Sequence, residues 1–356
     1  MLKFSFTKAV SLFTFALILL VACGTPYQPE EDEEQKEEEQ EEQISQTNSV
    51  PADETLETVT WNLLGYGTGF TGPEDIDQQT KNIVRVVDSL DADLYAFQEV
   101  HDQSDLNSIV SNMTDYRGFI ADHVGQSQRM AFAFNTNSID SLDSGAISSS
   151  DVRTEYQDDW SYNWAGSGNQ TGRLPLYFEF EYTFEGTTET FYAVVIHGKA
   201  NTGSSAAEYE EAYQRRKEAA EGLYYYLQDE KPNANIILLG DYNDDVDQSI
   251  YYESSDDGSR NYAETPYHLF VENSDFFNVI TKELSDSGQS ASIGYEDIID
   301  HITMSNELYD NYVQNSTAVY DSPQSYIENY GESTSDHLPV WAQFNITPSK
   351  SVPLSK

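Results

Sequence analysis

The stretch that decides the fold is Asn235-Ile236-Ile237-Leu238-Leu239-Gly240-Asp241-Tyr242-Asn243-Asp244. A continuous apolar run of this kind predicts a strand at residues 235–239. Polar side chains follow directly, at the C-terminal end of the strand. Because strand ends that share one rim of a sheet can converge on one pocket, the stretch predicts an α/β sheet with a functional rim.

Strand and helix patterns alternate on both sides of this stretch. Strands are predicted at residues 58–61, 93–100, 130–134, 174–182, 191–196, 302–304 and 338–344, which are rich in β-branched, aromatic and other apolar residues. Helical spacing of apolar residues predicts a helix at 76–90 and a longer one at 206–228, with Ser204 and Ser205 as capping candidates. The mixture indicates two packed sheets with helices outside, in one α/β domain at residues 56–347.

The chain is strongly acidic, with a formal net charge of -44 from 62 acidic and 18 basic residues. Residues 30–42 contain ten of the acidic side chains and one lysine, which leaves 52 acidic and 17 basic residues elsewhere. Such a surface repels anions and steers DNA poorly, and it keeps a protein soluble in high salt. The composition therefore points to a saline habitat and argues against tight binding of DNA at low salt.

The N-terminus has the pattern of a targeting segment. Lys3 and Lys8 precede an apolar run at residues 9–22, which ends in Leu20-Val21-Ala22-Cys23. This ending resembles a bacterial lipobox, so residues 1–22 are expected to be a lipoprotein signal peptide and Cys23 the lipidated residue. An uncleaved anchor helix is the alternative. Cys23 is the single cysteine, which excludes an internal disulfide and a cysteine-based zinc site.

The residues that follow Cys23 predict an extended tether. The acidic run lacks apolar periodicity and has one sign of charge, so residues 23–55 should be solvated. The run also resembles the surface-export signals of some Bacteroidetes lipoproteins. We therefore expect attachment to the outer membrane of the cell envelope, with exposure at the cell surface as one option. The protein is also expected to be a monomer. Residues 348–356 are expected to be a C-terminal tail.

Polar side chains recur where the predicted strands end or begin. They are Asn62, Gln98-Glu99, His197, Asp241 with Asn243, Asp300-His301 and Ser335-Asp336-His337. Carboxylate and amide oxygens suit hard cations such as Mg²⁺, Mn²⁺ or Ca²⁺. Such a cation polarises a phosphoryl oxygen, and histidines can bind phosphate oxygens or move protons near neutral pH. The chain lacks a serine nucleophile elbow and a Gly-rich phosphate loop.

Taken together and in this order, these motifs resemble the endonuclease/exonuclease/phosphatase superfamily. That superfamily includes deoxyribonuclease-I-like nucleases, abasic-site endonucleases, neutral sphingomyelinases and inositol-polyphosphate 5-phosphatases. The resemblance extends from residue 58 to residue 344. It implies a four-layer α/β/β/α sandwich of two packed mixed sheets flanked by helices. It also implies a divalent-metal-dependent phosphoric ester hydrolase, with Mg²⁺ as the expected ion and Mn²⁺ or Ca²⁺ as alternatives.

The resemblance also implies roles for individual residues. Glu99 matches the principal metal ligand, Asn62 lies beside the metal, and Asp336 contributes further. Asp241 matches the aspartate that orients or activates water, and Asn243 the asparagine that holds the scissile phosphate.

Four further residues match positions around the phosphate. His337 matches the histidine on the phosphate that is described as acid/base, and Asp300 the carboxylate that orients it. His197 resembles a second histidine of the nuclease and sphingomyelinase branches, and Arg173 a phosphate-binding arginine of deoxyribonuclease-I-like members. His197 as a core histidine and Arg173 as an ion-pair residue are the structural alternatives.

Other charged residues are interpreted as structural. Asp244 and Asp245 are expected to be solvated. The basic triplet Arg215-Arg216-Lys217 is expected to form a charged helix face, with contact to a polyanion as the alternative. His101, His123 and His268 show no metal-ligand spacing.

Three interpretations of the function agree with the sequence. The first interpretation is an extracellular endonuclease or exonuclease that hydrolyses nucleic acid by in-line attack of water, favoured by His197 and Arg173. The second is a phosphodiesterase or phosphatase that acts on phospholipid head groups or small phosphate esters. The third, of another class, is a non-catalytic surface lipoprotein that retains the fold for binding.

Overall fold

The computed structural model describes residues 55–346, with gaps at 70, 126–127, 167–171 and 256–257. The predicted signal peptide, Cys23, the acidic run at 30–42 and the tail at 348–356 lie outside the described residues. Within the described part of the chain, no helix combines the length and the apolar character that a bilayer crossing requires.

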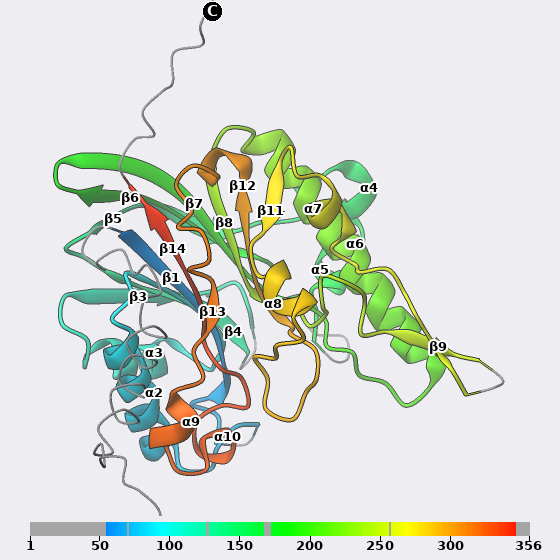
Figure 1. The fold of residues 1–356 in the computed structure, drawn as a ribbon, viewed down its shortest axis with the longest axis horizontal. Helices are drawn as coiled ribbons and strands as arrows, with labels where there is room; N and C mark the ends of the chain where they lie inside the picture. Colours follow the sequence, from blue (N-terminus) through cyan, green and yellow to red (C-terminus); the bar gives the residue numbers. More distant parts are fainter. Residues whose placement is uncertain (1–54, 70, 126–127, 167–171, 256–257, 347–356) are drawn as a thin grey trace, which may run out of the picture. The chain divides into compact units, whose positions relative to one another are not determined.

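Two six-stranded mixed sheets form the centre of the domain (Figure 1). The first has the order β13 (Ala318–Val319), β14 (Val340–Asn345), β1 (Thr55–Tyr66), β2 (Leu94–Val100), β4 (Arg129–Asn135) and β3 (Tyr116–Ile120). The second has the order β11 (Phe277–Val279), β12 (Asp300–Ser305), β8 (Asn235–Asp241), β7 (Thr187–His197), β6 (Leu176–Phe184) and β5 (Ile139–Ala146). Each sheet contains one parallel pair, β1 with β2 and β7 with β8, and its other pairs are antiparallel.

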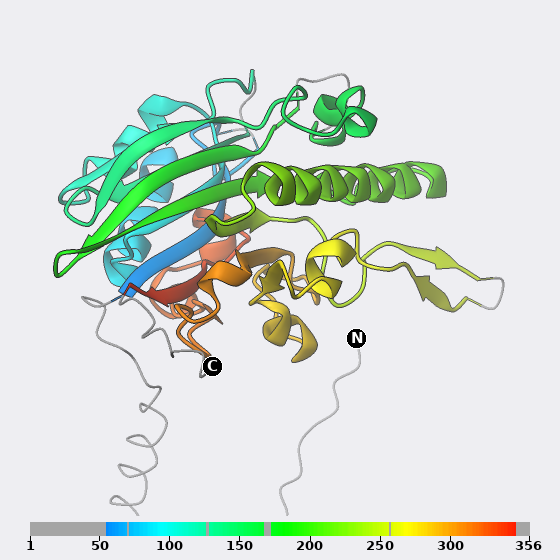
Figure 2. The ribbon, with the colours of Figure 1, turned by 90° about the horizontal axis from the view of Figure 1, so that it is seen from above.

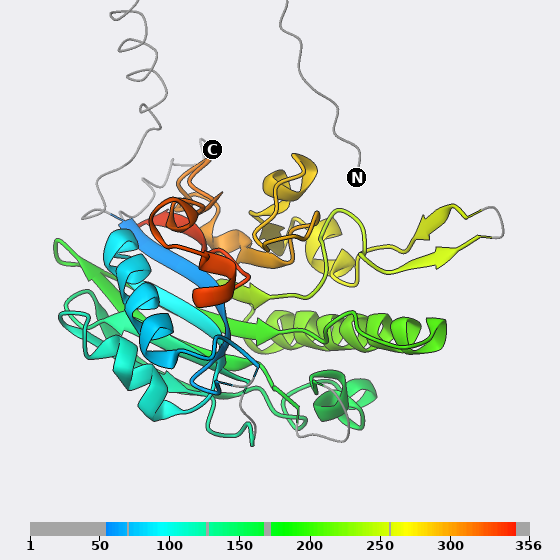
Figure 3. The ribbon, with the colours of Figure 1, turned by 90° about the horizontal axis from the view of Figure 1, so that it is seen from below.

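Helices cover the outer face of each sheet (Figures 2 and 3). The first sheet is covered by α2 (Ile76–Leu90) and α3 (Gln103–Val110), and the second by the long α6 (Ala206–Glu230) and α7 (His268–Glu272). The short helices are α4 (Thr154–Gln157), α5 (Trp160–Asn163), α8 (Lys282–Asp286), α9 (Pro323–Tyr326), α10 (Tyr330–Ser333) and the 3₁₀ helix η2 (Asn306–Leu308). A two-stranded hairpin, β9 (Tyr252–Ser254) and β10 (Arg260–Tyr262), projects beside α6. The predicted four-layer sandwich is confirmed.

Strand β8 shows why this sequence forms a central strand. Ile237 and Leu239 belong to the core between the two sheets, whereas Ile236 and Leu238 belong to the core beneath α6. Because successive side chains of a strand point to opposite faces, a strand covered on both sides needs apolar residues at every position. The continuous apolar run at residues 236–239 meets this requirement.

Predicted and observed elements agree closely where a local pattern defines them. The helix predicted at 76–90 has these bounds in the structure, and α6 begins after Ser205, whose side chain accepts a hydrogen bond from the backbone N–H of Glu208. Asp300 and His301, expected just before a strand, are its first two residues, because β12 extends to the end of β8.

Four charged residues that were expected to be solvated are buried in the structure, so this prediction is wrong for them. Asp244, Asp245, Arg215 and Arg216 are buried. Arg216 donates hydrogen bonds from Nε to Asp244 Oδ2 (2.8 Å) and from Nη1 to the carbonyl of Lys199 (2.8 Å). A buried charge needs a partner, and here each member of the pair supplies it for the other.

Candidate active site

Strand register brings the predicted site residues to one rim. On the parallel strands β7 and β8, His197 lies opposite Asp241. Strand β12 runs antiparallel to β8, so its first residue, Asp300, also lies opposite Asp241. In the first sheet, Asn62 of β1 lies opposite Gln98 of β2, next to Glu99. The two parallel pairs therefore end at the same side of the sandwich.

A pocket of about 250 Å³ lies at this rim. Eight predicted site residues line it: Asn62, Glu99, Arg173, His197, Asp241, Asn243, Asp336 and His337. The ninth, Asp300, is fully buried behind His337 and accepts its hydrogen bond. The fold thus brings the nine predicted side chains together, although they come from both sheets and from distant parts of the sequence.

Glu99 is held at the end of β2 in a constrained position. Its backbone is in the left-handed region, with φ +61°, which a non-glycine residue adopts at an energetic cost. Its Oε2 accepts a hydrogen bond from the backbone N–H of Gly65 (2.9 Å) and its Oε1 one from Gln128 (3.0 Å). Burial raises the pKa of Glu99, and the charge of Arg173 partly opposes this.

Asp241 is fixed through both carboxylate oxygens. Its Oδ2 accepts a hydrogen bond from Asn62 Nδ2 (3.0 Å), and its Oδ1 accepts one from the backbone N–H of Asn243 (2.9 Å). Burial raises the pKa of Asp241 to about 6, while the charge of His337 acts in the opposite direction. A carboxylate with a pKa close to neutral is suited to accept a proton at physiological pH.

The two histidines of the pocket differ in protonation. The Nε2 of His197 lies 3.4 Å from Asp241 and 3.7 Å from Glu99, yet burial and the charges of Arg173 and His337 lower its pKa well below the usual value. Burial would also lower the pKa of His337, but the charge of Asp300 and its 2.7 Å hydrogen bond to Nδ1 raise it to about 10. His197 is therefore neutral and His337 a cation at neutral pH.

Oxygen donors in the pocket fit a hard divalent cation. Glu99, Asn62 and Asp336 line it together, and such carboxylate and amide oxygens are the ligands that Mg²⁺ and Ca²⁺ prefer. The Oδ1 atom of Asp336 is buried and has no hydrogen-bond partner within the described part of the chain. The charge of Asp241 contributes to the raised pKa of Glu99, and a bound cation would relieve this repulsion.

Sequence reasoning missed six residues that line the pocket, and two of them, Gln128 and Lys199, have long polar side chains. Gln128 bridges the site, because it donates to Glu99 and accepts a hydrogen bond from Arg173 Nη1 (2.9 Å). Lys199 is buried, and its Nζ donates to the carbonyl of Ala200 (2.9 Å) and to Thr202 Oγ1 (3.2 Å). Lys199 follows His197 by two residues, a position that could have revealed it, whereas no pattern marks Gln128.

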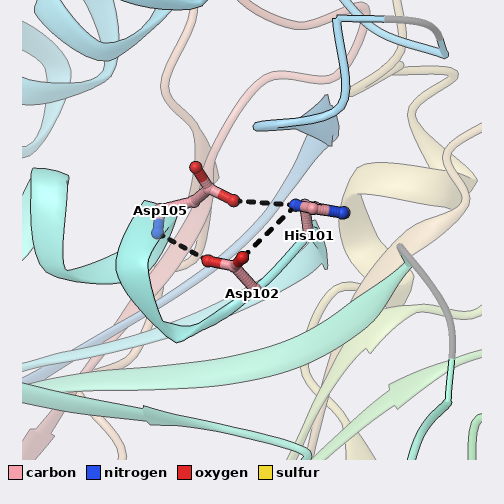
Figure 4. Close-up of side chains that lie close together, drawn as sticks. All are labelled: His101, Asp102 and Asp105. Atoms are coloured by element: carbon pink, nitrogen blue, oxygen red, sulfur yellow. Dashed lines mark hydrogen bonds and ion pairs between the residues drawn. The ribbon is translucent and has the colours of Figure 1, made fainter.

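A second histidine–carboxylate group lies at the start of α3 (Figure 4). Ligand atoms of His101, Asp102 and Asp105 lie within 4.8 Å of one another, although the sequence shows no metal-ligand spacing there. Asp102 caps the helix, since its Oδ1 accepts hydrogen bonds from the backbone N–H groups of Ser104 (2.7 Å) and Asp105 (3.0 Å). His101 Nδ1 lies 3.1 Å from Asp105. We interpret this group, which we call the α3 cluster, as a helix cap.

Comparisons with known proteins agree with this architecture. The family model described as "Endonuclease/Exonuclease/phosphatase family" matches residues 59–337. No curated protein matches the sequence. The catalytic domain of human Nocturnin with bound sulfate is 19% identical, with 82% of this chain and 95% of that chain covered and a TM-score of 0.55.

Two further solved structures share the fold. A humanized D. rerio TDP2 is 12% identical and an endonuclease/exonuclease/phosphatase from Bacteroides vulgatus is 14% identical. Each comparison covers 82% of this chain and 99% of the other, with a TM-score of 0.54. At these identities the structures show the fold, and the family model identifies the relationship. The chain belongs to the endonuclease/exonuclease/phosphatase family of phosphoric ester hydrolases, whose members generally use divalent metal ions.

Proposed function

We propose that this protein hydrolyses phosphodiester bonds of nucleic acid by in-line attack of water, with Mg²⁺ held by Asn62, Glu99 and Asp336. One observation carries the proposal. A carboxylate with a pKa of about 6, Asp241, and an imidazolium, His337, line the same pocket. One group can accept the proton of water while the other binds the negatively charged phosphate.

Asp241 is the proposed base. Its two hydrogen bonds, from Asn62 and from the backbone of Asn243, fix both oxygens, so the carboxylate has little freedom to rotate. Positioning of this kind places the attacking water before the reaction and reduces the entropy cost of the step. No covalent enzyme intermediate is needed, because water attacks phosphorus directly.

The cationic and hydrogen-bonding side chains hold the phosphate. His337 donates from the imidazolium that Asp300 orients, His197 presents a neutral imidazole, and Arg173 adds a buried positive charge. Asn243 holds the scissile phosphate beside Asp241. A Mg²⁺ ion held by Asn62, Glu99 and Asp336 would supply Lewis-acid polarisation of a phosphoryl oxygen and charge stabilisation for the leaving oxygen.

Small phosphate esters or phospholipid head groups are the second candidate substrate class. The pocket of about 250 Å³ suits a single phosphate group, and the net charge of -44 opposes long-range attraction of a polyanion. A nucleic-acid substrate would therefore depend on contacts close to the pocket rather than on the overall field of the protein.

The proposed location is the outer membrane of the cell envelope, through a lipid on Cys23. This part rests on residues 1–23 of the sequence alone. Incorporation of labelled palmitate in a bacterial host should be abolished by Cys23→Ala. Labelling that persists in this variant would exclude Cys23 as the lipidated residue.

A substrate panel tests the enzymatic proposal. It contains bis-p-nitrophenyl phosphate, plasmid DNA, RNA, sphingomyelin and inositol phosphates, each with Mg²⁺, Mn²⁺, Ca²⁺ or a chelator. Turnover of the diester and of nucleic acid with Mg²⁺, lost with chelator and in Glu99→Gln, is the expected result. Turnover of sphingomyelin or inositol phosphates alone would favour the second class. No turnover with any metal would contradict hydrolysis and favour a non-catalytic binding lipoprotein.

A further inference from the structure

A second, larger cleft lies next to the active-site pocket. It measures about 860 Å³ and lies between the N-terminal part of α6 and the β9–β10 hairpin, which run side by side in Figures 2 and 3. One loop forms part of both walls. Lys199, Ala200 and Thr202 line the active-site pocket, whereas Asn201 lines the cleft. A substrate whose phosphate occupies the pocket therefore has the cleft within reach.

Exposed tyrosines dominate the cleft. Tyr252 and Tyr262 lie directly opposite each other on the hairpin, with ring centroids 5.4 Å apart, and expose 36% and 38% of their surface. Arg260 lies 4.7 Å from the Tyr252 ring centroid and donates to the Tyr262 hydroxyl (3.2 Å). Tyr209 and Tyr295, exposed by 38% and 45%, add two further rings.

The hairpin is tied to the rest of the domain. Tyr251 stacks on Tyr213 of α6, with centroids 5.1 Å apart and an interplanar angle of 22°. Backbone hydrogen bonds join Ala263 to Tyr251 (3.0 Å) and Ser249 to Ala263 (3.1 Å). An isolated two-stranded hairpin is marginally stable in water, so these contacts are what keep the Tyr252–Tyr262 pair in place beside the pocket.

Charge restricts what can occupy the cleft. Glu210, Glu253 and Asp297 line it, and Arg260 is the one cation among its lining residues. Such a surface repels phosphate groups, whereas the neighbouring pocket contains Arg173, Lys199 and His337. The arrangement therefore separates a phosphate-binding pocket from an adjoining surface suited to uncharged rings.

We propose that this tyrosine cleft binds unpaired nucleobases of a single-stranded nucleic acid whose scissile phosphate lies in the active-site pocket. The inference rests on the proposed function and names its preferred substrate. Bases stack on aromatic side chains with little regard to sequence, because every base has a flat face. In a duplex these faces are covered by neighbouring bases, so the cleft favours single strands.

Binding without turnover tests the cleft separately from hydrolysis. Two fluorescein-labelled probes with the same number of phosphates are compared, a twelve-residue oligothymidylate and its abasic analogue. Both are titrated with the full chain that carries Asp241→Asn, in the presence of Mg²⁺. Oligothymidylate should bind about ten-fold more tightly, because only this probe can stack on the tyrosines. Equal affinity for the two probes would overturn the proposal.

Substitutions on the hairpin test whether Tyr252 and Tyr262 cause the difference in affinity between the two probes. In the same background, Tyr252→Ala with Tyr262→Ala should remove the preference for oligothymidylate, while Tyr252→Phe with Tyr262→Phe should retain it. Loss of the preference in the phenylalanine pair would show that hydroxyl groups make the contact, as recognition of a carbohydrate would require, and would overturn the proposal. Thermal unfolding checks that the hairpin variants remain folded.

A substitution on the α6 side of the cleft tests the proposal independently of the hairpin. Tyr209 lies on α6, outside the hairpin, and also lines the cleft. Tyr209→Ala should therefore reduce the preference for oligothymidylate over the abasic probe, even if the double change of Tyr252 and Tyr262 to alanine destabilises the hairpin. A preference that persists in all alanine variants would contradict the cleft assignment. Turnover of bis-p-nitrophenyl phosphate by the wild-type chain tests the hydrolase separately, so either part can fail while the other stands.

Discussion

Two histidine–carboxylate groups of this domain have similar composition and different environments. In the pocket, His337 Nδ1 lies 2.7 Å from Asp300, and the side chains are 11% and 0% exposed. In the α3 cluster, His101 Nδ1 lies 3.1 Å from Asp105, and the side chains are 43% and 20% exposed. The two distances alone would not distinguish the pair in the pocket from the pair in the helix cap.

Burial is what separates the two groups. Removal of water strengthens every charge interaction in the pocket, so Asp300 raises the pKa of His337 to about 10 although burial acts in the opposite direction. The α3 cluster faces solvent, which screens exposed pairs and leaves them with little energy. The raised pKa of His337 therefore depends on its environment, and a histidine beside a carboxylate in the sequence does not by itself indicate it.

Asp241→Asn should have the largest effect. The amide keeps the shape of the side chain but cannot accept the proton of water, so kcat with Mg²⁺ should fall by about a thousand-fold. Thermal unfolding should show a folded protein. Asp105→Asn in the α3 cluster is the matched control. A variant with near-normal turnover of bis-p-nitrophenyl phosphate would exclude Asp241 as the base.

Asp300→Asn should lower kcat by about a hundred-fold. It removes the negative charge that keeps His337 protonated, and the pKa of His337 should then fall. In the wild type, His337 is protonated below about pH 10 and Asp241 is ionised above about pH 6, so the plot of kcat against pH should be bell-shaped between these values. The alkaline limb of the variant should move to lower pH, and the acid limb should move in the same direction, because the charge of Asp300 also contributes to the raised pKa of Asp241. An unchanged alkaline limb would separate His337 from catalysis.

Lys199→Met should raise KM by about ten-fold, because the change removes a positive charge from the lining of the pocket while the stem keeps its volume. Burial and the charge of Arg215 lower the pKa of Lys199 to about 8, so the ammonium is present below this pH. The KM of the wild type should therefore increase as the pH rises through 8. Lys217→Met, on the more exposed face of α6, is the control. An equal rise of KM in both variants would point to a general charge effect.

Asp105→Asn and His101→Gln should have the smallest effect, within about two-fold in kcat/KM. Calorimetric titration with Mg²⁺ should give the same stoichiometry for Asp105→Asn as for the wild type. Loss of one bound ion in this variant would show that the α3 cluster is a metal site and would remove the distinction between the two groups.

Local patterns were sufficient for much of the fold and for most of the pocket. The continuous apolar run of β8 and the helical spacing of α2 predict their elements because each depends on neighbours along the chain. Site residues such as His197 and Asp241 could be identified because each comes at the end of an apolar strand. Gln128 follows no pattern, and only its contacts with Glu99 and Arg173 identify it.

The sequence by itself indicated eight strands of the two sheets, the helices α2 and α6, and most of the polar side chains at the rim. The strands β3, β5, β11 and β13 and the covering helices α3 and α7 appear only in the structure. The tertiary structure decided the charge state of each side chain and its partner. Arg216 and Asp244 are both charged and polar in the sequence, yet they are buried because they meet across α6 and the loop after β8. His197 and His337 likewise differ only through their surroundings. Burial and distant partners set these properties, and neither can be read from a local pattern.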